Sequence, residues 1–418
     1  MEDTKEAGGG LQPWQHAVVF LAACLIFVAR RPDAIFHAQF YAEDGRDWFA
    51  NAYNLGWFAA LLRPQDGYFQ TLPRLGASLS LLMPFVYAPL VMNLIAILVQ
   101  ALPVNILLAS QSSGWGSLRF RAVLAAVYVA LPNCGEISCG ITESQWVLAF
   151  CAFLALVACP PRSAGIQVFD IAVLLLCGIT GPFSFFFLPI AMFLLWRSRT
   201  GWRWITAALF CLTTLLQIGA FFLGNRGVRH PILTGASPVW FIRILSGSIY
   251  MGTLIGGNEI GLRSGRSAFI FLLCVAVAGT GIVAVCFAKA NVEMKLLLVF
   301  SAMIFAATLV APNLRPIPGL TGWQELTVAP GIHYWFFPTL AFAWSLLWCF
   351  RQPAQSLTVV SAPLLFLMCF GMVRDSRRPA FTNLHFAAYA EQLKDAPAGS
   401  AVTIPINPVG WNMVLIKH

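Results

Sequence analysis

One stretch of the sequence determines how the rest is interpreted, residues 40–75: F-Y-A-E-D-G-R-D-W-F-A-N-A-Y-N-L-G-W-F-A-A-L-L-R-P-Q-D-G-Y-F-Q-T-L-P-R-L. The chain is 59% hydrophobic and only 10% charged, yet this stretch is dense in charge of both signs. Its charged side chains are Glu43, Asp44, Asp47, Asp66, Arg46, Arg63 and Arg74. Because Glu43-Asp44 directly follows the first long apolar segment, we expect a carboxylate pair where the chain leaves an apolar phase. Either carboxylate could act there as a general base.

Aromatic residues follow the carboxylates at helical spacing. They are Trp48, Phe49, Tyr53, Trp57 and Phe58. This pattern predicts a helix that lies in a membrane interface with its rings at headgroup level. Asp66-Gly67-Tyr68 then predicts a turn that starts the return into the bilayer. A solvated amphipathic loop without chemistry is the alternative interpretation of the whole stretch.

Composition identifies the class of protein. With 418 residues, 34 Phe, 14 Trp and a mean hydropathy of +0.75, the chain holds more apolar surface than a soluble core can bury. It is therefore predicted to be an all-α polytopic membrane protein. The net charge is +9, but the basic residues are scattered between apolar segments, so membrane topology and an anionic substrate explain them better than nucleic acid does.

The order of apolar segments predicts about eleven transmembrane helices. Residues 1–13 are expected to form a disordered cytoplasmic tail, residues 14–373 the transmembrane domain with a first external loop at 31–71, and residues 374–418 a small extramembrane cap. Residues 14–29 form an uncleaved first span. Residues 72–87 are interpreted as re-entrant or interfacial, because a full crossing would place the first loop and the 132–145 loop on opposite sides. Within the cap, residues 385–394 predict a short helix and residues 401–406 a strand.

Charge in the short connections predicts the orientation. Basic loops that hold almost no acids are placed in the cytoplasm. They contain Arg119, Arg121, Arg162, Arg197, Arg199, Arg203, Lys289, Lys295 and Arg351. The outward segments are then 132–145, 180–182, 224–266, 312–333 and the C-terminal tail. These are also rich in basic residues, which indicates an anionic partner on that side.

Several outward polar residues are candidates for binding. Guanidinium groups hold phosphate well, so Arg226, Arg229 and His230 are predicted phosphate ligands, with ion pairing to nearby acids as the alternative. His333 and Tyr334 begin a late span, where they could bind phosphate or sugar or simply belong to an aromatic belt. Glu136 and Glu143 could face the first-loop carboxylates across a cavity or be solvated. The list of possible sugar or acceptor ligands is Glu136, Glu143, Asp66, Tyr68 and Arg74.

Other motifs are uninformative or missing. Cys134 and Cys139 could form a disulfide in an oxidising compartment or remain free, and both possibilities stay open. No Cys/His spacing resembles a zinc site, and neither GxxxxGK[ST] nor GxGxxG occurs. Charges are nearly absent from the middle of the apolar segments, which is unlike a proton-coupled transporter.

Taken together, these features resemble the integral-membrane glycosyltransferases of the GT-C fold. The resemblance is carried by Y-A-E-D-G (41–45) after an early span, by P-N-C-G-E-I-S-C-G-I-T-E-S-Q-W (132–146), by T-G-P-F-S (180–184), and by H-Y-W-F-F-P (333–338). It implies a GT-C-like bundle, amphipathic helices in the first external loop and a small external tail. It also implies a polyprenyl-phosphate-linked sugar as donor and a first-loop carboxylate as the catalytic base.

By position, that base is Asp44 or Glu43, and Asp44 is favoured because Gly45 would let the backbone turn its side chain into the cavity. The chain lacks the W-W-D-Y-G block of oligosaccharyltransferases and a large C-terminal domain, so the expected acceptor is a hydroxyl of a glycan or glycolipid. An inverting displacement is expected, with Mg²⁺ or Mn²⁺ as the cofactor considered. The expected location is a bacterial inner membrane with the site facing the periplasm. The competing interpretations are a lipid-linked-sugar flippase or transporter, and a channel or scaffold subunit.

Overall fold

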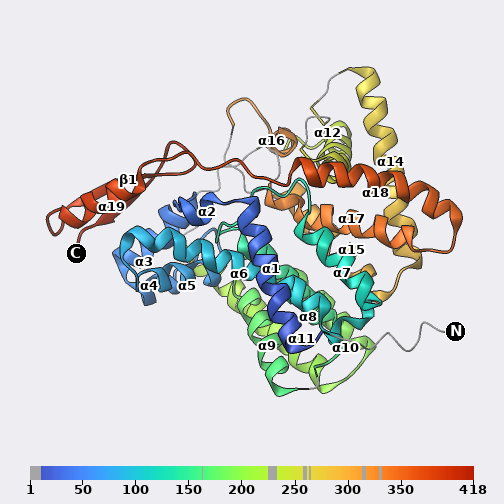
Figure 1. Cartoon of the computed structure of the whole chain (residues 1–418), viewed down its shortest axis with the longest axis horizontal. Helices are drawn as coiled ribbons and strands as arrows, with labels where there is room; N and C mark the ends of the chain where they lie inside the picture. The colour runs from blue at the N-terminus through green and yellow to red at the C-terminus, as the bar shows by residue number, and fades with distance from the viewer. Residues whose placement is uncertain are drawn as a thin grey trace.

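The computed structural model describes residues 11–161, 163–224, 233–257, 261–262, 265–312, 317–328 and 332–418. The described residues are mainly helical (Figure 1). In chain order the elements are α1 (Pro13–Arg30), α2 (Asp33–Phe36), the π-helix η1 (Asp44–Phe49), α3 (Ala50–Leu55), α4 (Trp57–Leu61), α5 (Thr71–Ser80), the short 3-10 helix η2 (Phe85–Tyr87), α6 (Ala88–Leu108), the 3-10 helix η3 (Ser110–Trp115), α7 (Leu118–Val129), α8 (Ser144–Val157), α9 (Ala164–Gly178), α10 (Phe183–Arg197), α11 (Gly201–Leu223), α12 (Pro238–Arg243), the π-helix η4 (Ile244–Met251), α13 (Gly252–Ile255), α14 (Arg266–Lys289), α15 (Val292–Val310), α16 (Gly322–Val328), the 3-10 helix η5 (His333–Trp335), α17 (Phe336–Phe350), α18 (Gln355–Arg374), α19 (Phe386–Asp395), β1 (Ala401–Ile406) and β2 (Trp411–Ile416).

The long apolar helices establish a membrane protein. Within the described ranges, seven helices are long and apolar enough to cross a membrane. They are Pro13–Arg30, Phe85–Leu108, Gly201–Leu223, Pro238–Ile255, Arg266–Lys289, Val292–Val310 and Gln355–Arg374. Shorter apolar helices lie at Ser144–Val157, Ala164–Gly178 and Phe183–Arg197. The predicted class, an α-helical polytopic membrane protein, is confirmed.

Two helices form the centre of the bundle. Nearly every residue of α8 and of α17 is buried, as expected for helices that are apolar on all sides and surrounded by other helices. Aromatic rings join them, with Phe150 of α8 and Trp344 of α17 at a centroid distance of 5.6 Å. By contrast, α14 and α18 expose large apolar side chains such as Val277 and Phe366, which is the pattern of surfaces that contact lipid.

The connections between helices gather at two ends of the bundle. We call one the cap end; it comprises residues 31–71, 130–143, 179–182, 332–335 and 375–382. We call the other the basic end; it comprises residues 110–117, 158–161, 198–200, 290–291 and 351–354. Backbone hydrogen bonds join connections within each end: Gly181 N donates to Phe69 O (2.9 Å) at the cap end, and Cys159 N donates to Gln111 O (3.0 Å) at the basic end.

The helix that follows the first loop is short. This helix, α5, has 10 residues, which corresponds to about 15 Å and is too short to span a bilayer. This agrees with the predicted re-entrant or interfacial character of residues 72–87. The predicted turn is also present: Gln65 and Tyr68 exchange backbone hydrogen bonds of 2.8 and 3.0 Å, and Asp66 and Gly67 both have positive φ.

The C-terminal cap shares a core with the first loop. The predicted helix and strand correspond to α19 and β1, while the partner strand β2 was not predicted; the two strands pair antiparallel with Ile404 opposite Met413. The ring centroids of Phe40 in the first loop and Phe386 in α19 are 5.4 Å apart. The first loop and the cap lie together on the left of Figure 1. Asn54 continues the sheet by donating to Val414 O and accepting from Ile416 N, both at 2.9 Å.

Candidate functional site

A cavity of about 540 Å³ lies at the cap end. Its walls come mainly from three regions that are distant in sequence, the first loop, the 133–143 connection and the C-terminal cap, and two further connections add Gly257 and Ile332. The lining residues are Arg31, Tyr41, Asp44, Asn133, Gly135, Glu136, Ser138, Gly140, Thr142, Glu143, Gly257, Ile332, Asp375, Arg378, Pro379, Ala380, Phe381, Thr382, Asn407, Pro408 and Val409.

Asp44 is held rigidly at the wall of the cavity. Its side chain is 2% exposed, and Oδ1 accepts hydrogen bonds from the backbone N (3.0 Å) and the hydroxyl of Thr142. Burial raises the pKa of Asp44 to about 6, and the hydrogen bonds from Thr142 limit the rise. A carboxylate with this pKa is mostly ionised at neutral pH and more basic than an exposed aspartate, as a general base should be.

Gly45 serves a different purpose from the one expected. We predicted that it turns the backbone toward the cavity, but it lies inside η1 without a positive φ. A Cβ at this position would lie 2.9 Å from the Cβ of Phe40 and 3.2 Å from Cδ1 of Ile406. Glycine is therefore required by close packing of η1 against the loop and the cap.

Trp48 and Arg74 stabilise the position of Thr142, the residue that donates hydrogen bonds to Asp44. Trp48, one turn further along η1, donates from Nε1 to the hydroxyl of Thr142 at 2.7 Å. The guanidinium of Arg74 lies over the Trp48 ring, 4.9 Å from its centroid, and Arg74 is completely buried. Arg74 was predicted to bind sugar or acceptor, but it does not line the cavity; its position fits support of Trp48 through a cation–π contact.

The structure separates the two members of the Glu43-Asp44 pair. Glu43 does not line the cavity and pairs instead with Arg46 at 3.5 Å, while Arg46 lies over the ring of Trp411 at 4.1 Å. Burial raises the pKa of Glu43 to about 7. Of the two predicted catalytic carboxylates, the geometry thus favours Asp44.

Glu136, Glu143 and His333 form a compact cluster across the cavity. His333 Nδ1 lies 2.8 Å from Glu136 Oε2 and 3.2 Å from Glu143 Oε2, and the backbone N of His333 also donates to Glu136 at 2.9 Å. Tyr334 is buried beside them, with its ring 4.2 Å from that of His333. The expectation that Glu136 and Glu143 face the first-loop carboxylate across a cavity agrees with this arrangement.

The charges of this cluster depend on one another. Burial lowers the pKa of His333, but the two carboxylates outweigh this effect and raise it to about 9. Burial also raises the pKa of Glu143 to about 8, whereas the imidazolium of His333 lowers that of Glu136 against the effect of burial. The ligand atoms of all three residues lie within 4.8 Å of one another. One nitrogen and two carboxylates could also hold a divalent cation such as Mn²⁺.

Two arginines bring positive charge into the cavity. Nε and Nη2 of Arg378 are buried and have no hydrogen-bond partner among the described residues, and its Nη1 lies 3.9 Å from Asp375. Arg31 lies with its guanidinium 3.5 Å from the centroid of the Phe381 ring and donates from Nη1 to Ser138 O (3.3 Å). Neither residue was predicted as a ligand. Two sequence signals could have indicated Arg31 and Arg378 as ligands. They are the Arg-Arg pairs at the ends of the first and last spans, Arg30-Arg31 and Arg377-Arg378.

The remaining predicted residues lie elsewhere. Arg226, Arg229 and His230 fall outside the described residues. Asp66 and Tyr68 belong to the turn of the first loop and do not line the cavity; the Tyr68 ring lies 6.4 Å from that of Phe185. Cys134 and Cys139 are both buried free thiols, so no disulfide joins them.

Comparison with models of known protein families finds no match, and comparison with curated proteins finds no similar sequence.

Proposed function

We propose that the chain is a membrane glycosyltransferase that moves a sugar from a polyprenyl-phosphate donor to a hydroxyl of a glycan or glycolipid acceptor. One observation carries the proposal: the buried carboxylate of Asp44 and the unsatisfied guanidinium donors of Arg378 line the same cavity. Transfer from a lipid phosphate needs a base for the acceptor and positive charge for the phosphate. This cavity offers both at the end of an apolar helix bundle.

The reaction would be an inverting single displacement. The acceptor hydroxyl gives its proton to Asp44, and its oxygen bonds to the anomeric carbon of the sugar. The bond between that carbon and the phosphate oxygen breaks, and its electron pair leaves with the polyprenyl phosphate. Because the leaving group departs as a stabilised anion, it needs cations more than it needs an acid.

The roles of the other residues follow from their positions. Arg378, with Arg31 beside it, would bind the phosphate of the donor and stabilise the charge that develops on it. Glu136, Glu143 and His333 would bind hydroxyls of the sugar or hold Mg²⁺ or Mn²⁺, which when bound would supply further positive charge to the phosphate. The nitrogen ligand favours Mn²⁺ over Mg²⁺.

The topology proposed for this activity has about eleven crossings, with the cap end outside. The connections alternate between the two ends from α1 to α18, with eleven crossings, if the shorter helices α7 to α10 and α17 also cross and if the segment Pro238–Ile255 begins and ends on the side of the cap end. The arginine and lysine residues in the connections of the basic end and in the helix ends next to them support a cytoplasmic location for that end. In a bacterial inner membrane the cavity would then face the periplasm.

The decisive experiment is incubation of the purified protein with a panel of polyprenyl-phosphate sugars and glycolipid acceptors. Release of polyprenyl phosphate together with a glycosylated acceptor, lost in Asp44→Asn, would support the proposal. If the protein instead moves intact donors between the leaflets of a vesicle without cleaving them, it is a flippase and the transferase assignment is wrong.

A further inference from the structure

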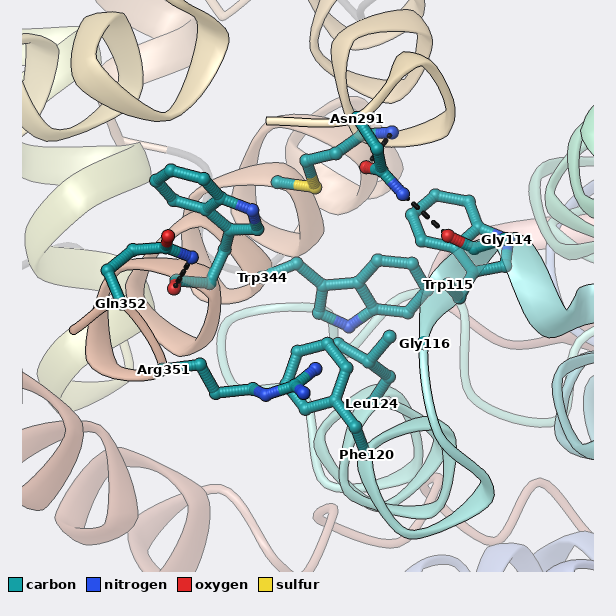
Figure 2. Close-up of a pocket in the computed structure, with 11 residues that line it drawn as sticks. Gly114, Trp115, Gly116, Phe120, Leu124, Asn291, Trp344, Arg351 and Gln352 are labelled. Carbon is teal, nitrogen blue, oxygen red and sulfur yellow. Dashed lines mark hydrogen bonds between the residues drawn. The ribbon is translucent and has the colours of Figure 1, made fainter. Parts of the chain in front are cut away.

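A second cavity lies at the basic end, at the opposite end of α17 from His333. Its volume is about 280 Å³, and its walls come from η3, α7, α15 and the last turn of α17. Figure 2 shows the indole of Trp344 at its centre, with Arg351 and Phe120 on one side and Gly114 on the other. We call it the basic-end pocket. It shares no lining residue with the cavity around Asp44.

Some polar groups of this pocket have hydrogen-bond partners within the protein, and others have none among the described residues. The amide of Asn291 donates to Gly114 O, and that of Gln352 donates to Trp348 O at 3.1 Å, so both amides are used to frame the pocket. The indoles of Trp344 and Trp115 differ, since the Nε1 of each is buried without an acceptor among the described residues, and Trp344 is the more buried of the two at 1% exposed. A buried N–H donor without an acceptor is costly, which favours a ligand that accepts from it.

Arg351 adds a charge to the same space. Its guanidinium lies over the ring of Phe120 at 4.2 Å, and no carboxylate of the described residues lies within ion-pairing distance of it. In Figure 2 the nitrogen-bearing edge of Trp344 faces the stacked pair of Arg351 and Phe120. Both donors belong to residues that line the same pocket, where an oxygen anion would be the fitting ligand.

The surroundings are basic and apolar. Arg119, Lys289 and Lys295 lie within two residues of lining positions along the chain, and one acid close to the same positions in sequence, Glu293, has its carboxylate against Gly114. Phe350, the chain neighbour of the lining residue Arg351, is 45% exposed, which suits contact with acyl chains. A phosphate carried by a membrane lipid meets both conditions, because its charge faces the donors while its chains remain in the bilayer.

We propose that the basic-end pocket binds the phosphate of an anionic phospholipid from the leaflet on that side. The phosphate accepts hydrogen bonds from Arg351 and from Trp344 Nε1, and the glycerol contacts the aromatic walls. Free inorganic phosphate offers the same oxygen atoms without the apolar part. This binding is independent of the proposed transferase activity, since it uses none of the residues around Asp44.

The test is native mass spectrometry of the purified full-length protein titrated with phosphatidylglycerol, phosphatidylcholine or inorganic phosphate. We expect phosphatidylglycerol to bind most tightly. Arg351→Gln should weaken its binding by roughly tenfold or more and Trp344→Phe by severalfold, because each removes one donor to a charged group. Arg119→Gln, an exposed arginine that does not line the pocket, should bind like the unmodified protein.

Three results would overturn the proposal. Equal binding of phosphatidylglycerol by the protein and by Arg351→Gln would exclude the pocket as the site. Equal binding of phosphatidylcholine would remove the preference for an anionic lipid. Saturation by inorganic phosphate that displaces the lipid would assign the pocket to a free anion. Arg351 is exposed at a helix end, so its variant remains informative even if Trp344→Phe fails to fold.

Discussion

The two ends of the bundle use the same residue type for different purposes. At the basic end, Arg121 donates to Leu107 O, and Arg203 donates to Leu156 O and Ala158 O. These carbonyls belong to the last turns of α6 and α8, where the helix leaves them without an internal partner. A guanidinium buried at a helix end therefore satisfies the backbone and stabilises the fold.

At the cap end, the neighbouring residues Arg30 and Arg31 show both uses side by side. Arg30 donates to Val129 O and Asp375 O, as the arginines of the basic end do. Arg31 instead lines the cavity, together with Arg378, whose Nε and Nη2 find no acceptor. The comparison shows that buried arginine does not by itself indicate function. What distinguishes a binding arginine is a donor that faces a cavity and that the protein leaves unsatisfied.

The largest expected effect is at Asp44. Asp44→Asn keeps the shape of the side chain but cannot accept the proton, so transfer should fall by about 10²–10⁴-fold, as for loss of a general base. The measurement is sugar transfer from a polyprenyl-phosphate donor by protein whose folding has been verified. Glu43→Gln is the matched control and should retain most activity, because Glu43 faces Arg46 and not the cavity. The reverse result would transfer the role of base to Glu43.

A substitution of Arg378 tests whether this arginine binds the donor phosphate or only supports the fold. Arg378→Gln should raise KM for the donor by roughly 10–100-fold, which corresponds to loss of one or two charge-assisted hydrogen bonds to phosphate. The exposed neighbour gives the control, since Arg377→Gln removes the same charge without touching the cavity. An unchanged KM in Arg378→Gln would mean that this arginine, like Arg30, only supports the fold.

The pH dependence of transfer tests the environment of Asp44. Because burial raises its pKa to about 6, the ionised and active form decreases as the pH falls through 6. Transfer measured with saturating donor should drop to about a tenth of its plateau near pH 5. A rate that still holds its plateau at pH 5 would show that Asp44 either has an ordinary pKa or is not the base.

The smallest effect on transfer activity is expected from a substitution of a buried arginine at the basic end. Arg203→Gln leaves the last carbonyls of α8 without their donors and should lower the free energy of unfolding by about 1–3 kcal/mol. Transfer per folded molecule should remain unchanged, because Arg203 is far from the cavity in the fold. Thermal unfolding in detergent measures the first quantity, with the exposed Arg199→Gln as control. Loss of transfer by correctly folded Arg203→Gln would contradict the separation of the two ends.

Parts of the site followed from local sequence because they depend on neighbours along the chain. Charge density and composition indicated the prominence of Glu43-Asp44 and the helix and strand of the cap, and the short α5 agrees with the prediction that residues 72–87 are re-entrant or interfacial. The sequence also indicated that Glu136 and Glu143 face Asp44, since both loops were assigned to one side. It missed Arg31 and Arg378 as ligands, because Arg-Arg pairs at span ends are normal topological signals.

The sequence by itself determined the class of protein and the periodic helices, because the transfer of apolar side chains out of water depends only on composition and order. Tertiary structure decided which charges are functional. It joined residues 44, 142, 143 and 378 around one cavity, directed Glu43 toward Arg46, and brought the turn of the C-terminal hairpin (residues 407–409) into the wall of that cavity. The physical reason is that desolvation and hydrogen-bond satisfaction depend on neighbours in space. Two identical guanidinium groups therefore differ in role according to whether a carbonyl or an empty cavity lies in front of them.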